Sequence, residues 1–311
     1  MLLKQVFIKY RNLFKASAKA SCAAEYLRRR LVMEQNILHL HESGIVDTKY
    51  CDHEIIVSLT TYGKRFYDVA ITIESIMEQT MKANRIILWI DNSYKGRPLP
   101  INLQLLQKRG LEVEYCKDIR SYTKLVPALR KYPEAAVITI DDDLIYKYDV
   151  LEHLIVAYQQ NPAFIYCHRM HKMRLDANGN LLPYFLWEWE STDTVPSHFN
   201  LPTGVGSVLY PPHCMAPEVI DENTFLGICK FADDIWFKAM ALKAGTKSQL
   251  VHSTDLHGND YVVNEDVQDV GLININGGQN LNDTQLKAVF EKYDLYKLCL
   301  LYTSDAADDL I

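Results

Sequence analysis

Short apolar runs alternate with segments of helical periodicity along the first half of the chain. Buried strands are predicted over residues 54–59, 85–90, 111–116 and 136–140, where β-branched and apolar residues dominate. Apolar residues at helical spacing between these runs predict helices over 68–79, 101–109 and 122–131. Strands that alternate with helices through short connections predict an α/β fold with a mostly parallel twisted sheet flanked by helices.

Three adjacent carboxylates, Asp141, Asp142 and Asp143, follow the last of these strands directly. Ligands of open α/β sheets bind outside the carboxyl ends of the strands. Adjacent carboxylates repel one another unless a cation or water neutralises them. If the strand continues, Asp141 and Asp143 lie on one side and can hold a hard divalent cation, whose other ligands include substrate phosphates. The alternative is a solvated acidic turn after a core strand.

The same edge of the sheet collects further polar residues. Thr60 and Thr61 follow the first strand, and Asp91 follows the second, where it can accept hydrogen bonds from a ribose or a base. Arg65 and Lys124 are cations that can meet a diphosphate. Read singly, the two cations are equally consistent with plain surface charge, and Asp91 with a turn residue.

The second half of the chain is richer in aromatic residues. Flat rings in residues 164–200 can stack on sugar faces, or they can form a small core under a long loop. These residues are Tyr166, His168, His171, Tyr184, Phe185, Trp187, Trp189 and His198. Gly204 and Gly206 follow, and they either let the backbone approach a ligand or bend a strand.

A second acidic pair, Asp233 and Asp234, opens a helix predicted over 231–244. Acidic residues favour the start of a helix because of its dipole, and the functional alternative makes one of the pair a catalytic base. His252 and His257 follow a predicted last strand at 248–251. Either histidine can supply a third metal ligand or donate to a phosphate, although a lone histidine more often does neither.

Bulk properties narrow the class of protein. The 311 residues carry a net charge of −6, which argues against nucleic acid as a partner. Seven scattered cysteines, an odd number, suit a reducing compartment such as the cytoplasm. No GxxxxGK[ST] segment is present, and no GxGxxG follows the first strand, which disfavours P-loop enzymes and dinucleotide-binding folds.

Residues 1–30 are basic, with eight lysines and arginines against Glu25 alone. Apolar residues at helical spacing in this segment predict an amphipathic helix. Such a helix can lie on an anionic membrane surface, or it can dock on the protein's own core with its cations in solvent. A further helix and a polar connection are expected over 31–50.

Taken in order, these segments resemble glycosyltransferases of the GT-A fold, close to the family 2-like bacterial enzymes of surface-polysaccharide synthesis. The resemblance spans about residues 54–260 and is carried by 58–62, Asp91, Lys124, Asp141 and Asp143, 204–206, and 233–236. It implies a nucleotide-diphosphate sugar as donor, with a UDP-sugar expected, and Mn²⁺ or Mg²⁺ as cofactor. The family pattern places Asp143 on the metal, Asp142 in the donor site, Asp91 near the base or ribose, and Asp234 as the base for the acceptor hydroxyl. The Asp-Asp pair also resembles exostosin-like transferases, so retention of configuration stays open beside the favoured inversion.

The resulting domain prediction has four parts. Residues 1–50 form a basic helical segment, and residues 51–260 form the catalytic domain, with a nucleotide-sugar half at 51–150 and an acceptor half at 151–260. Residues 261–298 form a C-terminal helical segment. Residues 299–311 continue no pattern and are expected to be a non-native or disordered tail.

We therefore expect a metal-dependent glycosyltransferase that acts on a hydroxyl of a saccharide or lipid-linked acceptor, in the cytoplasm or at the inner membrane face. A sugar nucleotidyltransferase shares the sheet and the metal, but usually carries a glycine-rich phosphate loop that residues 60–65 do not provide. A non-catalytic carbohydrate-binding protein with a degenerate site is the third interpretation.

Overall fold

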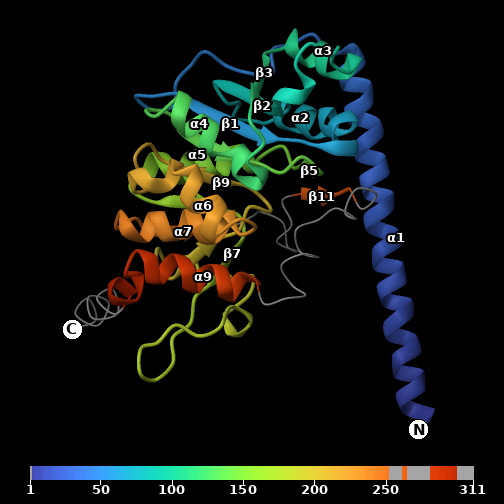
Figure 1. The fold of residues 1–311 in the computed structure, drawn as a ribbon. Helices are drawn as coiled ribbons and strands as arrows, with labels where there is room; N and C mark the ends of the chain where they lie inside the picture. The colour runs from blue at the N-terminus through green and yellow to red at the C-terminus, as the bar shows by residue number, and fades with distance from the viewer. Residues whose placement is uncertain (1, 252–260, 265–280, 300–311) are drawn as a thin grey trace.

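The computed structural model describes residues 2–251, 261–264 and 281–299, which form an α/β fold around one large sheet (Figure 1). The strands are β1 (Ile55–Thr60), β2 (Arg85–Asp91), β3 (Leu111–Cys116), β4 (Ala136–Thr139), β5 (Leu144–Tyr146), β6 (Ile165–Cys167), β7 (Met170–Lys172), β8 (Asn200–Pro202), β9 (Val208–Tyr210), β10 (Ser248–Leu250) and β11 (Tyr261–Val263). The α-helices are α1 (Leu2–His39), α2 (Val69–Met77), α3 (Ile101–Gln107), α4 (Val126–Lys131), α5 (Val150–Gln160), α6 (Glu222–Ile228), α7 (Asp233–Lys243) and α9 (Leu281–Lys292). Short 3₁₀ turns are η1 (Gly63–Tyr67), η2 (Asn92–Tyr94), η3 (Arg120–Lys124), η4 (Tyr184–Leu186) and η5 (Pro217–Ile220).

The predicted fold class is confirmed. Seven strands form one sheet in the order β10-β6-β9-β4-β1-β2-β3. Strand β1 pairs in parallel with β2 and β4, β2 with β3, and β6 with β10, whereas β9 runs antiparallel to β4 and β6. Two small antiparallel ribbons, β5 with β11 and β7 with β8, accompany this sheet.

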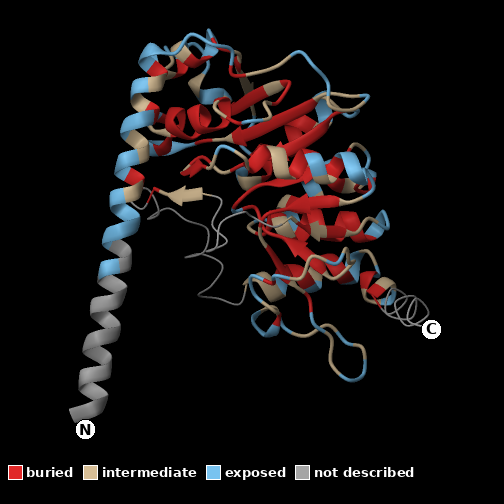
Figure 2. Ribbon diagram, turned by 180° about the vertical axis from the view of Figure 1, so that it is seen from behind, coloured by how far each residue is buried: buried red, intermediate tan, exposed pale blue. Residues whose placement is uncertain are grey.

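The sheet is buried on both faces because successive strand residues point to opposite sides. In β1, Ile55, Val57 and Leu59 pack in one core with α1, α2, α3 and α5, while Ile56 belongs to the other core with α4, α7 and α9. Figure 2 shows the resulting buried layer through the centre of the molecule. The polar residues that follow the strands are thereby held on a rigid frame.

Helix α1 is continuous from Leu2 to His39, so the expectation of a separate helix after residue 30 is wrong. Its second half docks on the body, where Tyr26, Met33 and Ile37 are buried. Two of the basic residues also serve this contact: Arg29 Nη2 donates to the Tyr146 carbonyl at 2.6 Å, and Arg30 Nη2 pairs with Asp68 Oδ1 at 2.8 Å. These arginines therefore have a structural role in the folded chain.

The helix predicted over 122–131 is interrupted at Leu125, where the 3₁₀ turn η3 ends and α4 begins. Pro127 lies in the first turn of α4, and proline has no N–H to continue hydrogen bonding from the preceding turn. Lys124 consequently sits at the end of a short turn, and its carbonyl accepts a hydrogen bond from Ser58 Oγ of β1 at 2.6 Å. This break fixes Lys124 against the end of β1.

A buried ion pair joins α2 to the chain around α3. Arg109 Nη1 lies 2.5 Å from Glu74 Oε2, and the two side chains are 4% and 0% exposed. Arg109 Nε also donates to the Glu42 carbonyl at 2.9 Å. Burial raises the pKa of Glu74 by desolvating its charged form, and the guanidinium of Arg109 opposes this shift.

We predict that Arg109→Met lowers the free energy of unfolding by about 3–5 kcal/mol, because it leaves a buried carboxylate without its cation. Urea denaturation followed by circular dichroism measures this loss. The matched control is Lys131→Met, which breaks the exposed pair with Glu114 and is expected to cost less than about 1 kcal/mol. Equal losses in the two variants would contradict the assigned role of the buried pair.

Candidate functional site

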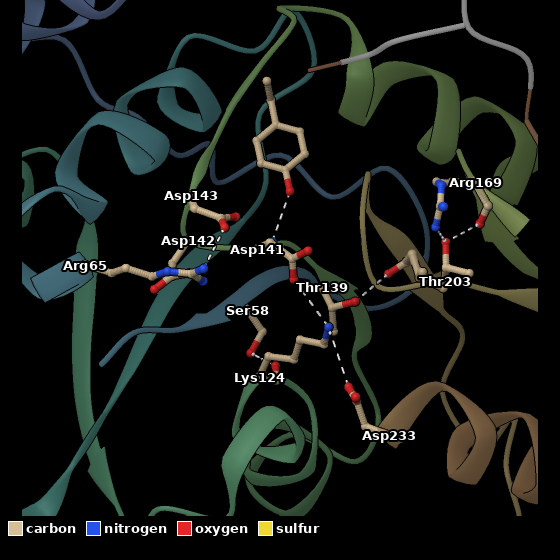
Figure 3. Close-up of polar contacts among 12 residues, drawn as sticks. Ser58, Arg65, Lys124, Thr139, Asp141, Asp142, Asp143, Arg169, Thr203 and Asp233 are labelled. Atoms are coloured by element: carbon tan, nitrogen blue, oxygen red, sulfur yellow. Dashed lines mark hydrogen bonds and ion pairs between the residues drawn. The ribbon is translucent and has the colours of Figure 1, made fainter. Parts of the chain in front are cut away.

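The acidic triplet lies where β4 leaves the sheet (Figure 3). Strand β4 ends at Thr139, and the chain turns through Asp142 and Asp143 before β5 begins at Leu144. The strand therefore does not continue through the triplet, which was the condition for the expected placement of Asp141 and Asp143 on one side. The turn instead gives the two carboxylates different cationic partners.

Arg65 of η1 holds the second and third aspartates together. Its Nη1 lies 2.9 Å from Asp142 Oδ1, and its Nη2 lies 3.0 Å from Asp143 Oδ2. Thr61 Oγ1 donates to the other oxygen of Asp142 at 2.6 Å, and Thr72 Oγ1 donates to the Asp142 carbonyl at 3.1 Å. Burial raises the pKa of Asp142 to about 6 in spite of these partners. Asp142 thus anchors the acidic turn to the loop after β1.

Lys124 lies between the two acidic segments. Its Nζ is 3.3 Å from Asp141 Oδ1 and 3.5 Å from Asp233 Oδ2, and the residue is 8% exposed. Burial alone would lower the pKa of Lys124, but the carboxylates of Asp141, Asp233 and Asp234 raise it well above its usual value. The side chain is therefore a buried ammonium ion that links the end of β4 to the start of α7.

Gly204 makes room for this ammonium. A Cβ at position 204 would lie 2.3 Å from Lys124 Nζ and 3.4 Å from Asp234 Oδ1. The requirement for glycine here is steric. Gly206 is required for a second reason, since its φ of +100° lies in the region that residues with side chains rarely adopt. It packs near His168, Arg169 and Tyr261, so it borders the cluster without contacting Lys124.

Asp234 lies in the first turn of α7, next to Gly204, where a Cβ would lie 3.4 Å from Asp234 Oδ1. Burial of its carboxylate, together with the neighbouring charge of Asp233, raises the pKa of Asp234 to about 7. A carboxylate with this pKa can exchange a proton near neutral pH, which is the property required of a general base.

Some of the residues predicted from the sequence lie outside this cluster. Thr60 Oγ1 donates to the Trp89 carbonyl of β2 at 3.0 Å. Asp91 accepts from the amides of Ser93 at 2.8 Å and Asp118 at 3.1 Å, so it caps η2 and joins the ends of β2 and β3. Hydrogen bonds from Ser93 are the main cause of the lowered pKa of Asp91. His252 and His257 lie outside the described residues.

Three contacts of the cluster were not anticipated from the sequence. The Tyr146 hydroxyl accepts the amide of Asp141 at 3.0 Å, and Ser58 bonds to the Lys124 carbonyl. Arg169 donates to Thr203 Oγ1 at 2.9 Å, next to Gly204, and both residues lie to one side of the carboxylates in Figure 3. Only the position of Thr203 beside the glycine segment offered a signal in the sequence.

The oxygen donors suit a hard divalent cation that is shared with a ligand. In residues 2–251, 261–264 and 281–299, no three acidic, histidine or cysteine side chains converge as a protein-only metal site. Asp141 is the most exposed carboxylate of the triplet, with 25% of its side chain accessible, and Asp143 follows it in the turn. Mg²⁺ is commonly held by one or two carboxylates together with substrate phosphates. The residues present fit that arrangement.

A cavity of about 220 Å³ lies apart from the carboxylates, between the ends of β2 and β3 and helix α6. Trp89, Cys116, Arg130 and Glu222 are among the residues that line it. None of the residues predicted as functional from the sequence contributes to its wall.

Comparisons with known proteins add a fold neighbour. No protein-family model and no curated protein matches the chain. Among solved structures, the chain is similar to CMP:2-keto-3-deoxy-manno-octonic acid synthetase in complex with CTP, with 12% sequence identity and a TM-score of 0.36. The similarity covers 64% of this chain and 90% of the synthetase. Similarity at this level does not identify an activity for this chain.

The raised pKa of Asp234 predicts a pH dependence of stability. A carboxyl group whose pKa is about 7 when folded and about 4 when unfolded stabilises the fold at low pH, and this contribution is lost between pH 4 and 7. We therefore expect the stability of Asp234→Asn, relative to the wild type, to increase as pH rises through that window. Urea denaturation at several pH values measures the difference.

The control for this titration is Asp47→Asn, which changes an exposed aspartate in the connection before β1. Its stability relative to the wild type should stay level over the same pH range. If the stability difference between Asp234→Asn and the wild type were also independent of pH, Asp234 would have the same pKa in the folded and the unfolded chain, and the prediction would be wrong.

Proposed function

We propose that this chain is a glycosyltransferase that moves a sugar from a nucleotide-diphosphate donor, a UDP-sugar being expected, to a hydroxyl group of a saccharide or lipid-linked acceptor. The observation that carries the proposal is the position of Lys124. One buried ammonium contacts both Asp141, at the end of the central strand, and Asp233, beside Asp234 at the start of α7. A donor-binding segment and a candidate base are thus held within one cluster.

On the donor side, Arg65 and Lys124 supply positive charge at the carboxyl edge of the sheet. Guanidinium and ammonium groups are the side chains that bind phosphates. Asp141 and Asp143 would hold Mn²⁺ or Mg²⁺ jointly with the donor diphosphate. When bound, the cation would act as a Lewis acid that neutralises charge on the leaving nucleotide.

On the acceptor side, Asp234 is the candidate base. With a pKa of about 7, its carboxylate can take the proton of an acceptor hydroxyl as that hydroxyl attacks the sugar. Gly204 leaves room beside the carboxylate, and Asp233 holds the ammonium of Lys124 near it. General base catalysis of this kind contributes roughly 10²–10⁴-fold to a rate and favours inversion of configuration.

A sugar nucleotidyltransferase is the second candidate, because the same parallel sheet edge with its carboxylates would suit a metal-bound nucleoside triphosphate. A TM-score of 0.36 gives no basis for a choice between the two activities. Their products differ, however: a glycosyltransferase releases a nucleoside diphosphate from a nucleotide sugar, whereas a nucleotidyltransferase releases pyrophosphate from a nucleoside triphosphate.

We predict nucleoside diphosphate release from a panel of nucleotide sugars, increased by Mn²⁺ or Mg²⁺ and by saccharide acceptors. Asp143→Ala removes a proposed metal ligand, and Asp234→Asn removes the proposed base. Each should lower the rate at least about 100-fold with little change in far-UV circular dichroism. The wild-type rate should rise with pH through about 7, as Asp234 ionises.

The matched control is again Asp47→Asn, which should keep the wild-type rate. A parallel assay supplies CTP or UTP with sugars or sugar acids and measures pyrophosphate. Pyrophosphate without diphosphate release would replace the proposal with the nucleotidyltransferase. An Asp143→Ala protein that is active without added metal would remove the metal assignment, and heat of UDP binding that is independent of Mn²⁺ in calorimetry would favour a degenerate binding site.

We further propose that α1 contacts an anionic membrane surface. The sequence of residues 1–30 is strongly basic, and Leu27, Leu31 and Leu38 are 56%, 61% and 51% exposed on the docked part of the helix. Their spacing places them within about 40° of one another around the helix. No helix in the described part of the chain is long and apolar enough to span a bilayer. Contact along the surface suits an apolar strip combined with lysine and arginine.

We predict that removal of residues 2–20 abolishes co-sedimentation with vesicles that contain phosphatidylglycerol. The deletion removes five cations, each worth about 1 kcal/mol at an anionic surface, and it spares Tyr26, Arg29 and Arg30, which hold the helix on the body. Phosphatidylcholine vesicles serve as the uncharged control. Unchanged sedimentation of the truncated chain would contradict membrane contact through the basic segment, and the exposed leucines would then be expected to contact another partner, such as a second copy.

A further inference from the structure

Two aromatic residues of the loop that connects β7 to β8, Tyr184 and Trp189, lie against His171 of β7. The rings of His171 and Trp189 are 4.8 Å apart at 33°, and Tyr184 lies 5.5 Å from Trp189 and 6.0 Å from His171. Trp189 is 49% exposed, whereas His171 behind it is buried. We refer to His171, Tyr184 and Trp189 as the aromatic platform.

The platform is fixed in place by polar contacts on each side. The Tyr184 amide donates to Asp283 Oδ1 of α9 at 2.7 Å. Burial lowers the pKa of His171 to about 4, so the neutral ring accepts the amide of Glu190 through Nδ1 at 3.0 Å. Rings held in this way lose little conformational freedom when a ligand binds, which favours recognition.

A charged pair forms the rim of the platform. Glu190 follows Trp189 and has a left-handed φ of 50°, and its Oε1 lies 2.8 Å from Arg169 Nη2. Residues other than glycine seldom adopt this φ, and such strain concentrates at functional sites. The Glu190 side chain is 68% exposed, so its carboxylate is accessible to a ligand that covers Trp189.

Arg169 connects this rim to the candidate base. Its Nη1 donates to Thr203 Oγ1 at 2.9 Å, and its carbonyl accepts the Thr203 amide at 3.1 Å. Thr203 precedes Gly204, where a Cβ would lie 3.4 Å from Asp234 Oδ1, so the contacts of Arg169 lead to the segment that lies against the base. Burial is the main cause of the raised pKa of Tyr184, and the charge of Asp234 adds to it.

We propose that Trp189, supported by Tyr184 and His171 and bordered by Arg169 and Glu190, is a saccharide subsite that presents the acceptor hydroxyl to Asp234. An apolar ring face beside exposed hydrogen-bonding groups matches a sugar, whose C–H face is apolar and whose hydroxyls can donate to Glu190 and accept from Arg169. The assignment of this saccharide as the acceptor rests on the proposed function, and it favours a saccharide acceptor over the lipid portion of a lipid-linked one.

The test is binding of the full-length chain to lactose, maltose, cellobiose and N,N′-diacetylchitobiose, measured by saturation-transfer NMR titration with UDP and the diamagnetic cation Mg²⁺ present. Trp189 is exposed, whereas Trp89, Trp187 and Trp236 are at most 4% exposed, so protection of tryptophan emission from acrylamide reports on this site. We expect at least one disaccharide to bind and to protect the emission. Trp189→Ala should weaken that binding about tenfold, and Trp189→Phe should restore most of it.

Tyr148→Ala is the matched control, since Tyr148 is a 64% exposed aromatic residue outside this loop and should leave binding unchanged. Equal binding by Trp189→Ala and the wild type, or no binding of any disaccharide by the wild type, would overturn the subsite. Saccharide binding through Trp189 in a chain that releases no nucleotide from any donor would support the subsite and contradict the proposed transferase activity.

Discussion

The arrangement of the site depends on the ion pairs that the buried ammonium of Lys124 makes with Asp141 and Asp233. The ammonium is buried between carboxylates that come from the end of β4 and the start of α7, two segments about ninety positions apart in the chain. A buried carboxylate without a cation costs several kcal/mol, so Asp141, Asp233 and Asp234 could not share this space without it. The lysine therefore determines whether the two halves of the chain can present their acidic residues to a common ligand.

Several local features of the backbone fix the position of the Lys124 ammonium. The break at Leu125 ends the turn that carries Lys124, and Ser58 fixes the carbonyl of the lysine to β1. Because β9 runs antiparallel beside β4, the segment that enters β9 passes the point where β4 ends. Gly204 lies in that segment, and its missing side chain leaves the volume that the ammonium occupies. The pairing of β9 with β4 and the missing side chain of Gly204 thus both determine where Lys124 Nζ lies.

Much of the fold could be predicted because strands and helices leave a local record in the sequence. Runs of apolar and β-branched residues marked β1, β2 and β3 within a residue or two of their ends. The acidic triplet after an apolar strand was also visible in the sequence. What the sequence did not reveal is which cation faces which carboxylate. That pairing depends on the turn after Thr139 and on the break before Pro127, and neither alters the hydrophobic periodicity.

Because the sequence does not show which groups face each other, it also left the roles of α1 and Asp91 open. Basic residues at helical spacing look the same in a sequence whether they face a membrane or contact the rest of the chain, as Arg29 and Arg30 do. Asp91 follows a strand as a ribose-binding residue would, yet its oxygens accept two backbone amides. Discrimination between such uses requires the position of the partner, which is a property of the tertiary structure.

Charge balance gives a reason for metal dependence that does not rest on the spacing of aspartates. The cluster brings together five carboxylates, from Asp141 to Asp143 and from Asp233 and Asp234, against the two cations Arg65 and Lys124. A diphosphate that entered this site alone would add negative charge to an excess of negative charge, in a region where burial weakens screening. Burial is the main cause of the raised pKa values of Asp142 and Asp234, and neighbouring carboxylates add to both shifts. The proposed activity therefore requires that a nucleotide diphosphate enter the cluster together with a cation, which Asp141, the most exposed carboxylate of the triplet, is the most accessible to meet.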